Sequence, residues 1–504
     1  MANPLFDALF GQHAGRETPF LHLPDGGVIT HAAFLARAGS LANALIACGL
    51  MAGDRVALQI DKSPDALALY AACVQAGLVF LPLNPAYTPA EVDYFVSNSG
   101  AKMLIADPAK ADKLADVAKS TGARLETLDT NSNGTLAGLA AEQPSSFETV
   151  TRKDDDLAAF LYTSGTTGRS KGAMMTQKNL LSNAQTLTKL WQFSDQDVLL
   201  HALPIFHTHG LFVATNVMLL SGGAMIFMPK LDVDQLIQFM PRATTMMGVP
   251  TFYTRLLDHA GFTPELTEHM RLFISGSAPL LAETHKAFEA RTGHRILERY
   301  GMTETNMNTS NPYTGARRAG TVGFPLPDVE LKVTDAETGE TLPQGEIGVI
   351  EVRGPNVFKG YWQMPEKTAA ELRADGFFIT GDLGLIDDQG YVQIVGRGKD
   401  LIISGGYNIY PKEIEVILDD LPGVLESAVI GLPHGDLGEA PFAVLARRQK
   451  QEPDVEAILA TLNAQLARFK CPRKIAVVDA LPRNTMGKVQ KNVLREIYSE
   501  AFKT

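Results

Sequence analysis

Residues 162–172 form a segment whose composition suits it to binding phosphate. The sequence Tyr-Thr-Ser-Gly-Thr-Thr-Gly-Arg-Ser-Lys-Gly follows the apolar run 157–161, which predicts a loop at the end of a strand. Glycines free the backbone to turn and expose N–H groups, hydroxyls add donors, and Lys171 adds a positive charge. The Gly-x4-Gly-Lys-Ser/Thr spacing of a Walker A loop is absent. We therefore predict a different phosphate loop, built from Thr163, Ser164, Gly165, Thr166, Thr167, Gly168 and Lys171.

Five further short motifs follow this loop along the chain. They are Ser-Gly-Ser-Ala-Pro at 275–279, Tyr-Gly-Met-Thr-Glu at 300–304, Phe-Ile-Thr-Gly-Asp at 378–382, Gly-Arg-Gly-Lys-Asp at 396–400 and Pro-Arg-Asn-Thr-Met-Gly-Lys at 482–488. Each motif alone is a weak signal, since a lone charged residue is more often a turn residue or a solvated surface cation.

Taken together, the six ordered motifs resemble those of the adenylate-forming acyl-CoA synthetases. That superfamily also includes luciferases and the adenylation domains of peptide synthetases. The resemblance covers essentially the whole chain, from near residue 15 to near residue 500. One small departure is Ser170, where many relatives carry proline, and we expect it to alter the stiffness of the loop rather than its chemistry.

The resemblance implies a ligase that activates a carboxylic acid with ATP. A carboxylate is a poor electrophile, because its charge is delocalised and its leaving group would be oxide. Attack on the α-phosphorus of ATP makes an acyl-adenylate, from which the thiol of CoA can displace AMP. The first step concentrates negative charge and needs cations and oriented donors. The expected cofactors are ATP and Mg²⁺, with CoA as a substrate; neither zinc nor flavin is expected.

The motifs also imply roles for individual residues. Lys488 stabilises charge between carboxylate and α-phosphate, and it is the main catalytic candidate together with Lys171 and Glu304. Glu304 and Thr163 are the expected Mg²⁺ ligands, because a hard cation prefers oxygen. Asp382 accepts from the ribose hydroxyls, with Arg397 nearby. The rest of the expected ATP site comprises Ser275, Gly276, Ser277, Ala278, Tyr300 and Thr303.

The second step depends on the C-terminal part of the chain. In relatives, the residue at the Lys399 position is the pivot for a large rotation of the C-terminal domain. A few backbone torsions can reorient a domain in this way. One orientation presents Lys488, and the other presents a glycine-rich loop that lines a tunnel for the pantetheine arm. The expected tunnel and CoA residues are Ser404, Gly405 and Gly406, with Lys470 and Arg473 as weaker candidates that also suit solvated surface cations.

Arg299, just before the 300–304 motif, indicates which acid is used. Many relatives for fatty or aromatic acids carry a small residue here, whereas a guanidinium beside the acyl site needs a partner anion. A second substrate carboxylate would supply it, which predicts a short dicarboxylate such as malonate or methylmalonate, as in malonyl-CoA synthetases. The alternative is an Arg299 paired with Glu298 or another acid, and a medium-chain or aryl monocarboxylate substrate. His207, Thr208 and Met307 are the further pocket candidates.

Two other function classes fit the sequence less well. A carrier-loading adenylation domain is disfavoured, because no carrier domain is expected after residue 504 and the Gly405-Gly406 motif is present. A non-catalytic nucleotide sensor would be expected to lack the charged catalytic residues. All four are present in this sequence: Lys171, Glu304, Asp382 and Lys488. The motif around Lys488 also resembles the site at which relatives are switched off by reversible acetylation, which predicts a lysine acetyltransferase and a deacetylase as partners.

Composition limits the remaining possibilities. The 504 residues carry a net charge of −11, which disfavours nonspecific binding to nucleic acid or to anionic membranes. Cys48, Cys73 and Cys471 are too few and too scattered for a disulfide framework or a zinc cluster. The residues 1–10 do not read as a signal peptide, and the apolar stretches 67–83 and 211–228 are too broken for membrane helices. We expect a soluble, cytoplasmic protein in which both stretches are core.

The elements that must hold these motifs alternate between short apolar strands and amphipathic helices. This pattern predicts an α/β fold, with mixed or largely parallel sheets in a large N-terminal domain. The strand-like pairs in 317–396 predict a β-rich subdomain, and later residues read as a small, mobile α+β domain. The predicted divisions are 1–396 for the N-terminal adenylation domain, 397–400 for the hinge and 401–504 for the C-terminal domain. Predicted elements include strands at 55–59, 78–82, 271–275 and 442–446 and helices at 63–76, 414–421 and 491–502.

Overall fold

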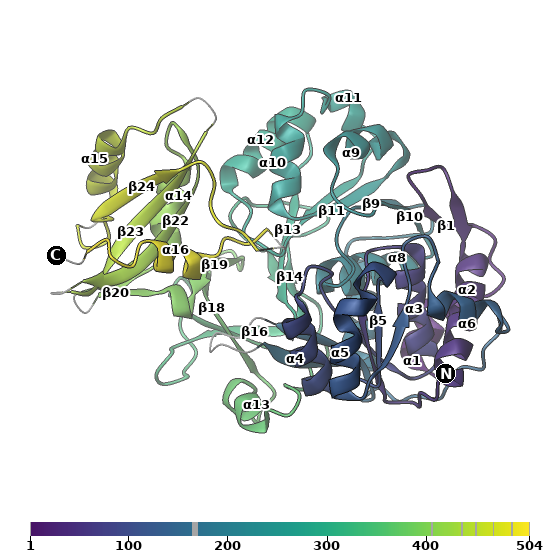
Figure 1. Cartoon of the computed structure of the whole chain (residues 1–504). Helices are drawn as coiled ribbons and strands as arrows, with labels where there is room; N and C mark the ends of the chain where they lie inside the picture. Colours follow the sequence, from purple (N-terminus) through teal and green to yellow (C-terminus); the bar gives the residue numbers. More distant parts are fainter. Residues whose placement is uncertain are drawn as a thin grey trace.

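The structure, a computed structural model, describes residues 2–163, 170–404, 407–434, 437–448, 451–466, 468–484 and 487–502. The purple-to-teal N-terminal part forms the larger mass in Figure 1, and the yellow C-terminal part forms a smaller one beside it. The green strands that follow the large sheets lead from one to the other.

The first large sheet has six strands in the order β6-β5-β3-β4-β7-β8. All neighbours are parallel except β7 and β8, which are antiparallel and flank the predicted phosphate loop. Helices α4 and α5 cover one face with a separate apolar cluster. The strands are β3 (Arg55–Gln59), β4 (Val79–Pro82), β5 (Met103–Ala106), β6 (Arg124–Thr127), β7 (Leu157–Thr163) and β8 (Lys171–Thr176). The helices along this part are α2 (His31–Ala47), α3 (Pro64–Gln75), α4 (Pro89–Ser99), α5 (Ala111–Thr121) and α6 (Thr135–Ala141).

The second large sheet has nine strands in the order β15-β14-β13-β12-β11-β9-β10-β1-β2. Its centre is parallel, and β14, β15 and β2 are antiparallel additions at the two ends. The strands are β1 (Pro19–His22), β2 (Val28–Thr30), β9 (Val198–His201), β10 (Ala224–Phe227), β11 (Thr245–Gly248), β12 (Leu272–Ser275), β13 (Leu297–Met302), β14 (Asn306–Ser310) and β15 (Phe324–Pro325). The helices are α1 (Pro4–Leu9), α7 (Gln177–Leu190), the π-helical η3 (His209–Thr215), α8 (Asn216–Ser221), α9 (Val233–Phe239), α10 (Pro250–Asp258), α11 (Pro264–Thr267) and α12 (Ala282–Thr292).

Helix α3 shows why these residues form these elements. The Ser63 hydroxyl caps it by accepting from the Ala66 N–H, and Pro64 occupies its first turn. The helix is apolar on all sides and is buried along nearly its whole length, as expected for a helix enclosed by other elements. The two large sheets and this helix share one continuous apolar core. The apolar stretches 67–83 and 211–228 are therefore core, as predicted.

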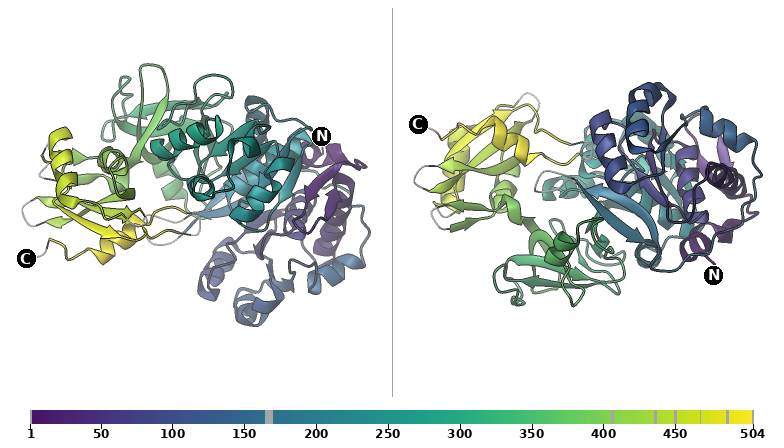
Figure 2. Two further views of the ribbon diagram at one scale, coloured as in Figure 1. Left: turned by 90° about the horizontal axis from the view of Figure 1, so that it is seen from above. Right: turned by 60° about the horizontal axis from the view of Figure 1, so that its bottom comes forward.

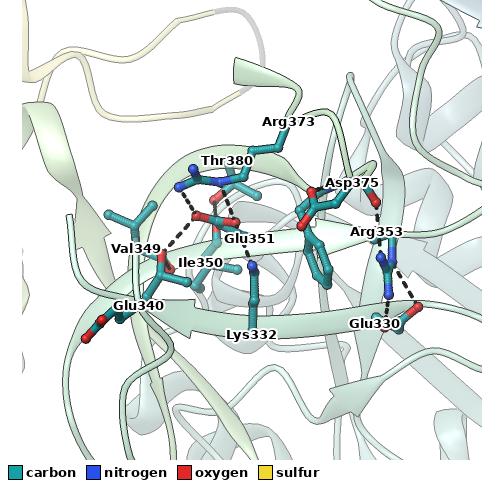
Figure 3. A network of polar contacts seen from close by, with 12 residues as sticks. Glu330, Lys332, Glu340, Val349, Ile350, Glu351, Arg353, Arg373, Asp375 and Thr380 are labelled. Carbon is teal, nitrogen blue, oxygen red and sulfur yellow. Dashed lines mark hydrogen bonds and ion pairs between the residues drawn. The ribbon is translucent and has the colours of Figure 1, made fainter. Parts of the chain in front are cut away.

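The predicted β-rich subdomain forms as an antiparallel four-stranded meander. Its strands are β16 (Glu330–Thr334), β17 (Gly348–Arg353), β18 (Phe378–Ile386) and β19 (Val392–Arg397), with α13 (Pro365–Glu371) between the second and third. Glu351 on β17 has no exposed surface, and Figure 3 shows it beside Arg373 and Lys332. The Thr334 hydroxyl also donates to Glu351 Oε1. Arg353 and Glu330 pair nearby at the surface.

The C-terminal part is an α+β unit, as predicted. Its sheet has the order β21-β20-β23-β22, and β24 pairs in parallel with β23. Separate apolar clusters cover the two faces. The elements are β20 (Ile402–Ser404), β21 (Tyr407–Ile409), α14 (Pro411–Asp419), β22 (Val424–His434), β23 (Gly438–Arg447), α15 (Val455–Gln465), β24 (Lys474–Val478) and α16 (Lys491–Ile497).

The predicted helix at 491–502 is too long, because α16 ends at Ile497. The residues beyond it form turns that bring the rings of Tyr498 and Phe502 against Phe442 on β23. Tertiary packing of these aromatic rings overrides the local helical pattern. The predicted helix at 414–421 also shifts, since α14 begins at Pro411.

The C-terminal part contacts the N-terminal part directly. Arg448 Nη2 lies 2.6 Å from a carboxylate oxygen of Glu283 on α12, and Arg495 on α16 pairs with Asp400 in the 398–400 turn. Both views in Figure 2 show a yellow loop segment of the C-terminal part extending toward the teal elements. Across the described ranges, no helix is both long and apolar enough to span a membrane.

Candidate active site

The predicted nucleotide motifs meet at the ends of β7, β12 and β13, at the turn between β13 and β14, and on β18 and β19. Carboxyl ends of parallel strands lie at one sheet edge, where ligand sites of α/β folds commonly form. Thr163 ends β7, Lys171 begins β8, and Glu304 lies in the β13–β14 turn. The predicted loop residues Ser164, Gly165, Thr166, Thr167 and Gly168 lie outside the described residues.

Glu304 and its surroundings form an oxygen-rich cluster. The Thr163 hydroxyl lies 3.5 Å from Glu304 Oε1, and the Tyr361 hydroxyl lies 3.0 Å from the same atom. Glu304 is buried, and its carboxylate has no ion-pair partner in the described part of the chain. A buried carboxylate beside a hydroxyl is the donor set that a hard divalent cation prefers, so these residues fit Mg²⁺.

Lys171 is buried beside this cluster. Its Nζ lies 3.3 Å from Glu371 Oε2 and 4.1 Å from the centroid of the Tyr361 ring. Tyr361 thus contacts Lys171 with its ring and both Glu304 and Glu371 with its hydroxyl.

Two partners fix the position of the Asp382 carboxylate on β18. The Tyr300 hydroxyl donates to Asp382 Oδ2 at 2.5 Å, and Arg397 Nε lies 2.6 Å from Asp382 Oδ1. The charge of Asp382 raises the pKa of Arg397, while burial and the neighbouring Asp382 raise the pKa of the Tyr300 phenol. The structure therefore brings together Asp382 and Arg397, predicted at the ribose, with Tyr300 of the predicted ATP site.

Arg299 is the least satisfied charge of the site. Its side chain is buried, and its Nε and Nη2 atoms have no hydrogen-bond partner among the described residues. Burial lowers the pKa of the Arg299 guanidinium to about 9. Glu298 precedes it on the same strand and points to the other face, where its Oε1 accepts from the Leu280 N–H. The alternative in which Glu298 pairs with Arg299 therefore has no hydrogen bond or ion pair to support it in the described structure.

Gly276 makes room for this guanidinium. A Cβ at position 276 would lie 2.3 Å from Arg299 Cζ and 2.4 Å from its Nη1, well inside contact distance. The predicted nucleotide motif at 275–279 thus also packs on the predicted acid-binding side chain. Ser275 Oγ beside it is buried without a partner in the described structure.

The histidine segment lies close to Arg299. His209 is buried and His207 is partly buried. Desolvation, Lys488 and Arg299 lower the pKa of His207 to about 3, so this ring is neutral. His209 Nδ1 lies 3.1 Å from Ser277 Oγ, while His209 Nε2 and Thr208 Oγ1 have no partner in the described part. Met307 is buried on β14.

Lys488 reaches this site from the C-terminal part. Lys488 is exposed, yet desolvation by the surrounding protein lowers its pKa, and Arg397, Asp382, Glu304 and Arg299 are the charged groups near enough to shift it. The chain before it turns at Gly487, which has φ +75° and approaches Thr251 on α10. A residue more than 180 positions away in sequence thus joins Arg299 and Glu304.

No hydrogen bond or ion pair in the described structure joins the side chains predicted for CoA and for the hinge pivot to this cluster. Lys399 is exposed in the 398–400 turn, and Ser404 is buried at the end of β20. Lys470 Nζ lies 2.6 Å from Glu413 Oε1, and Arg473 is exposed. Gly405 and Gly406 lie outside the described residues.

Sequence reasoning missed three members of the arrangement. His209 was not among the predicted pocket residues, although its Nε2, which has no partner in the described structure, lies beside the Arg299 site. Tyr361 and Glu371 belong to no recognised motif, and 57 residues separate Glu304 from Tyr361 in the chain. No local spacing could have indicated contacts that only the fold creates.

Comparison with known proteins agrees with this geometry. The AMP-binding enzyme family matches residues 11–362, and the AMP-binding enzyme C-terminal domain matches residues 413–488. The chain is 34% identical to a malonate–CoA ligase of Arabidopsis thaliana, over 89% of this chain and 78% of that protein. It is 36% identical to a feruloyl-CoA synthase of an Amycolatopsis species, over 93% of this chain and 94% of that protein.

A crystal structure of ATP-bound MatB from Rhodopseudomonas palustris superposes with a TM-score of 0.98. The two chains are 58% identical, and the match covers 100% of each. The family models together cover most of both parts of the chain and account for the use of ATP and CoA. The chain therefore belongs to the AMP-binding enzyme family and is an AMP-forming acid–thiol ligase.

Proposed function

We propose that the chain joins malonate, and other short dicarboxylates such as methylmalonate, to CoA through an acyl-adenylate. The single observation that carries this proposal is Arg299, a guanidinium only 3% exposed whose Nε and Nη2 have no partner among the described residues. A buried charge without a partner is costly, so a ligand that brings an anion is favoured. The Arabidopsis relative is a malonate–CoA ligase, which supports the same substrate.

The distal carboxylate would sit on Arg299 while the reacting carboxylate faces the α-phosphate. A bidentate guanidinium–carboxylate pair fixes both position and orientation. His207, Thr208 and Met307 are proposed to line the pocket, and we add His209, whose Nε2 is free to donate when Nδ1 accepts from Ser277.

In the first step, a carboxylate oxygen attacks the α-phosphorus, and the bond to the bridging oxygen of pyrophosphate breaks. Lys488 would stabilise the charge that develops between the carboxylate and the α-phosphate, and Lys171 with the 163–168 loop would hold the outer phosphates. Asp382, fixed by Tyr300 and Arg397, would accept from the ribose hydroxyls. Ser275, Gly276, Ser277, Ala278 and Thr303 are proposed to complete the nucleotide site.

Glu304 and Thr163 are proposed to hold Mg²⁺. The ion would neutralise charge on the phosphate oxygens during transfer. The chain's own part is to present two oxygen ligands from the end of β7 and from the β13–β14 turn.

In the second step, the CoA thiol loses its proton, its sulfur attacks the acyl carbon, and the bond to AMP breaks. We propose domains at 1–396 and 401–504, with Lys399 in the 397–400 hinge, so that rotation replaces Lys488 by the loop containing Ser404, Gly405 and Gly406. Lys470 and Arg473 are proposed CoA contacts. Lys470 would have to exchange Glu413 for the ligand.

A panel of short mono- and dicarboxylates, assayed by AMP release with CoA, tests the substrate. We expect turnover of malonate by the parent protein and loss of about 10⁴-fold in kcat/KM for malonate in Arg299→Ala, because a site built around a charged partner rejects ligands when that partner is lost. Arg295→Ala, which removes a half-exposed arginine paired with Glu289, is the matched control and should retain parent activity. Full malonate activity in Arg299→Ala would overturn the proposal.

A second candidate is a ligase for an aryl or medium-chain monocarboxylate. The 36% identity to a feruloyl-CoA synthase favours it. In that case the same panel would give the highest kcat/KM with an aromatic or fatty acid, and Arg299→Ala would leave that activity intact.

Reversible acetylation of Lys488 is proposed as a regulatory modification. Removing its charge should abolish formation of the adenylate but spare thioester formation from supplied acyl-adenylate, since only the first step uses this cation. Both half-reactions are measurable with a variant carrying acetyl-lysine at position 488. Equal loss of the two would contradict the division of labour.

A further inference from the structure

Glu371 is the counter-ion of Lys171 in this structure. The two side chains approach to 3.3 Å, and both are largely shielded from water. A buried ammonium needs an anionic partner, and Lys171 has no other carboxylate partner in the described part of the chain. Phosphate oxygens that bind Lys171 must therefore compete with Glu371.

Glu371 has partners of its own that do not depend on Lys171. Lys367 Nζ, one helical turn earlier on α13, lies 2.7 Å from Oε1, and the Tyr361 hydroxyl lies 2.8 Å from Oε2. Burial pushes the pKa of Glu371 up, but hydrogen bonds from Lys367 and Tyr361 and the charge of Lys171 bring this pKa below its usual value. Glu371 is therefore an anion near neutral pH, and it stays paired if Lys171 turns away.

The Tyr361 hydroxyl links this pair to Glu304. It lies 3.0 Å from Glu304 Oε1 and 2.8 Å from Glu371 Oε2, yet a phenol has one proton to donate. Only one of the two carboxylates receives it at a time. When another partner binds Glu304, the Tyr361 hydroxyl can donate its proton to Glu371. This hydrogen bond compensates Glu371 for the loss of its contact with Lys171.

The backbone around Glu371 is firmly anchored. Two residues later, Arg373 donates to both oxygens of the buried Glu351, at 2.9 and 2.6 Å, as Figure 3 shows. Lys332 and Thr334 complete the shell around Glu351. An exchange of partners at Lys171 therefore needs side-chain rotation only, with α13 staying in place.

We propose that Glu371 is an exchangeable counter-ion of Lys171. It holds the ammonium at the start of β8 and yields it to phosphate oxygens, after which Lys367 and Tyr361 balance the charge of Glu371. This inference rests on the proposed function, in which Lys171 binds the phosphates of ATP. Glu371 is thus a positioning residue, acting through Lys171 rather than on the substrate.

The test measures binding of MgATP and of inorganic pyrophosphate by calorimetry, with no acid or CoA present. Because Glu371 competes with phosphate, Glu371→Gln should lower both Kd values by about three- to tenfold, the net worth of one ordinary hydrogen bond. Glu371→Asp keeps the charge on α13 but shortens the side chain, so it should also bind more tightly. Glu366→Gln makes the same chemical change at an exposed position on the same helix and should leave both Kd values at parent level.

Unchanged or weaker binding by a Glu371→Gln protein with the parent's thermal midpoint would overturn the inference. Tighter binding by Glu371→Gln with unchanged binding by Glu371→Asp would also overturn it, since net charge would then suffice without direct contact. Lys171→Ala separates the inference from the proposed function. If Lys171→Ala binds MgATP as the parent does, both the phosphate-binding role of Lys171 and the counter-ion role of Glu371 are refuted. If Lys171→Ala binds more weakly while the Glu371 variants are unchanged, only the counter-ion role is refuted.

Discussion

Individual charged residues of the site are mostly paired with one another. Asp382 has Arg397, and Lys171 has Glu371. Arg299 differs, because the described structure offers its Nε and Nη2 no partner. Leaving a buried charge unpaired costs several kcal/mol. Natural proteins retain such a charge at functional sites, where a bound ligand supplies the missing partner. The specificity of the enzyme is therefore expected to depend on the shape of the space around this one side chain.

Gly276→Ala tests that dependence. The new Cβ would occupy the place of the guanidinium, so Arg299 must rotate away from its position. We expect the KM for malonate to rise at least about tenfold, the cost of one lost charged contact, with the KM for ATP changed less. Steady-state kinetics on both substrates check this. Gly138→Ala, on α6 with open space around the new Cβ, is the control and should match the parent; an unchanged KM for malonate in Gly276→Ala would refute the packing argument.

Glu298 gives a prediction on pH. Burial raises the pKa of its carboxyl from 4.5 to about 8 in the folded protein. Between these values the unfolded chain releases the proton while the folded chain keeps it, so this group lowers the free energy of unfolding as pH rises from 4.5 to 8. Glu298→Gln should therefore be as stable as the parent near pH 4.5 and more stable by about 2–4 kcal/mol at pH 8.5.

Thermal midpoints of parent and Glu298→Gln across this pH range provide the measurement. Glu268→Gln, which changes an exposed carboxylate, should show no such trend. A difference between Glu298→Gln and the parent that stays constant from pH 4.5 to pH 8.5 would contradict the assigned protonation.

At the scale of elements, strand ends and short turns carry the chemistry, and buried ion pairs hold those elements in place. Glu304 lies in a three-residue turn between β13 and β14, and Asp382 lies within β18. Glu351 on β17 stabilises the meander that carries Asp382. It forms ion pairs with Lys332 on β16 and with Arg373 in the segment after α13 (Figure 3). The sequence predicted a β-rich subdomain in 317–396, because turn residues separate its strand-like runs. It gave no indication of Glu351, since a charged residue inside a strand usually faces solvent.

Arg373→Ala tests this stabilisation. It leaves Glu351 buried with Lys332 at 3.4 Å and Thr334 as its remaining partners. We expect a loss of about 1–3 kcal/mol in the free energy of unfolding, because removing one member of a buried ion pair leaves the other charge buried with fewer partners. Chemical denaturation is the measurement, and Arg353→Ala is the matched control. Its partner Glu330 is exposed, so a change within about 0.5 kcal/mol is expected. Equal losses in the two variants would show that Glu351 has no special role.

At the scale of the whole molecule, the site exists only where the two parts of the chain meet. Lys488 comes from the C-terminal part, and the residues around it come from the sheets and the meander of the N-terminal part. The salt bridge between Arg448 and Glu283 spans the same boundary. We expect it to favour the orientation that presents Lys488.

Arg448→Ala should therefore slow adenylate formation about two- to fivefold, the worth of a half-exposed ion pair, and leave thioester formation from supplied adenylate unchanged. Single-turnover assays of the two half-reactions make the comparison. Arg447→Ala removes the neighbouring arginine, which pairs with Asp479 and Glu452 inside the C-terminal part, and should affect neither half-reaction. A slowing of both half-reactions by Arg448→Ala would show a general loss of structure instead.

The amino-acid sequence by itself determined the fold class, the family and the order of the nucleotide motifs. Those signals are local: glycine and hydroxyl spacing in the loop, and apolar periods of strands and helices. Only the tertiary structure decided which partner each charge has. Arg299 Nε and Nη2 have no partner among the described residues although Glu298 adjoins Arg299, and Lys171 contacts Glu371, which lies 200 residues away. The reason is geometric, because neighbours on a strand point to opposite faces while the fold brings distant elements into contact.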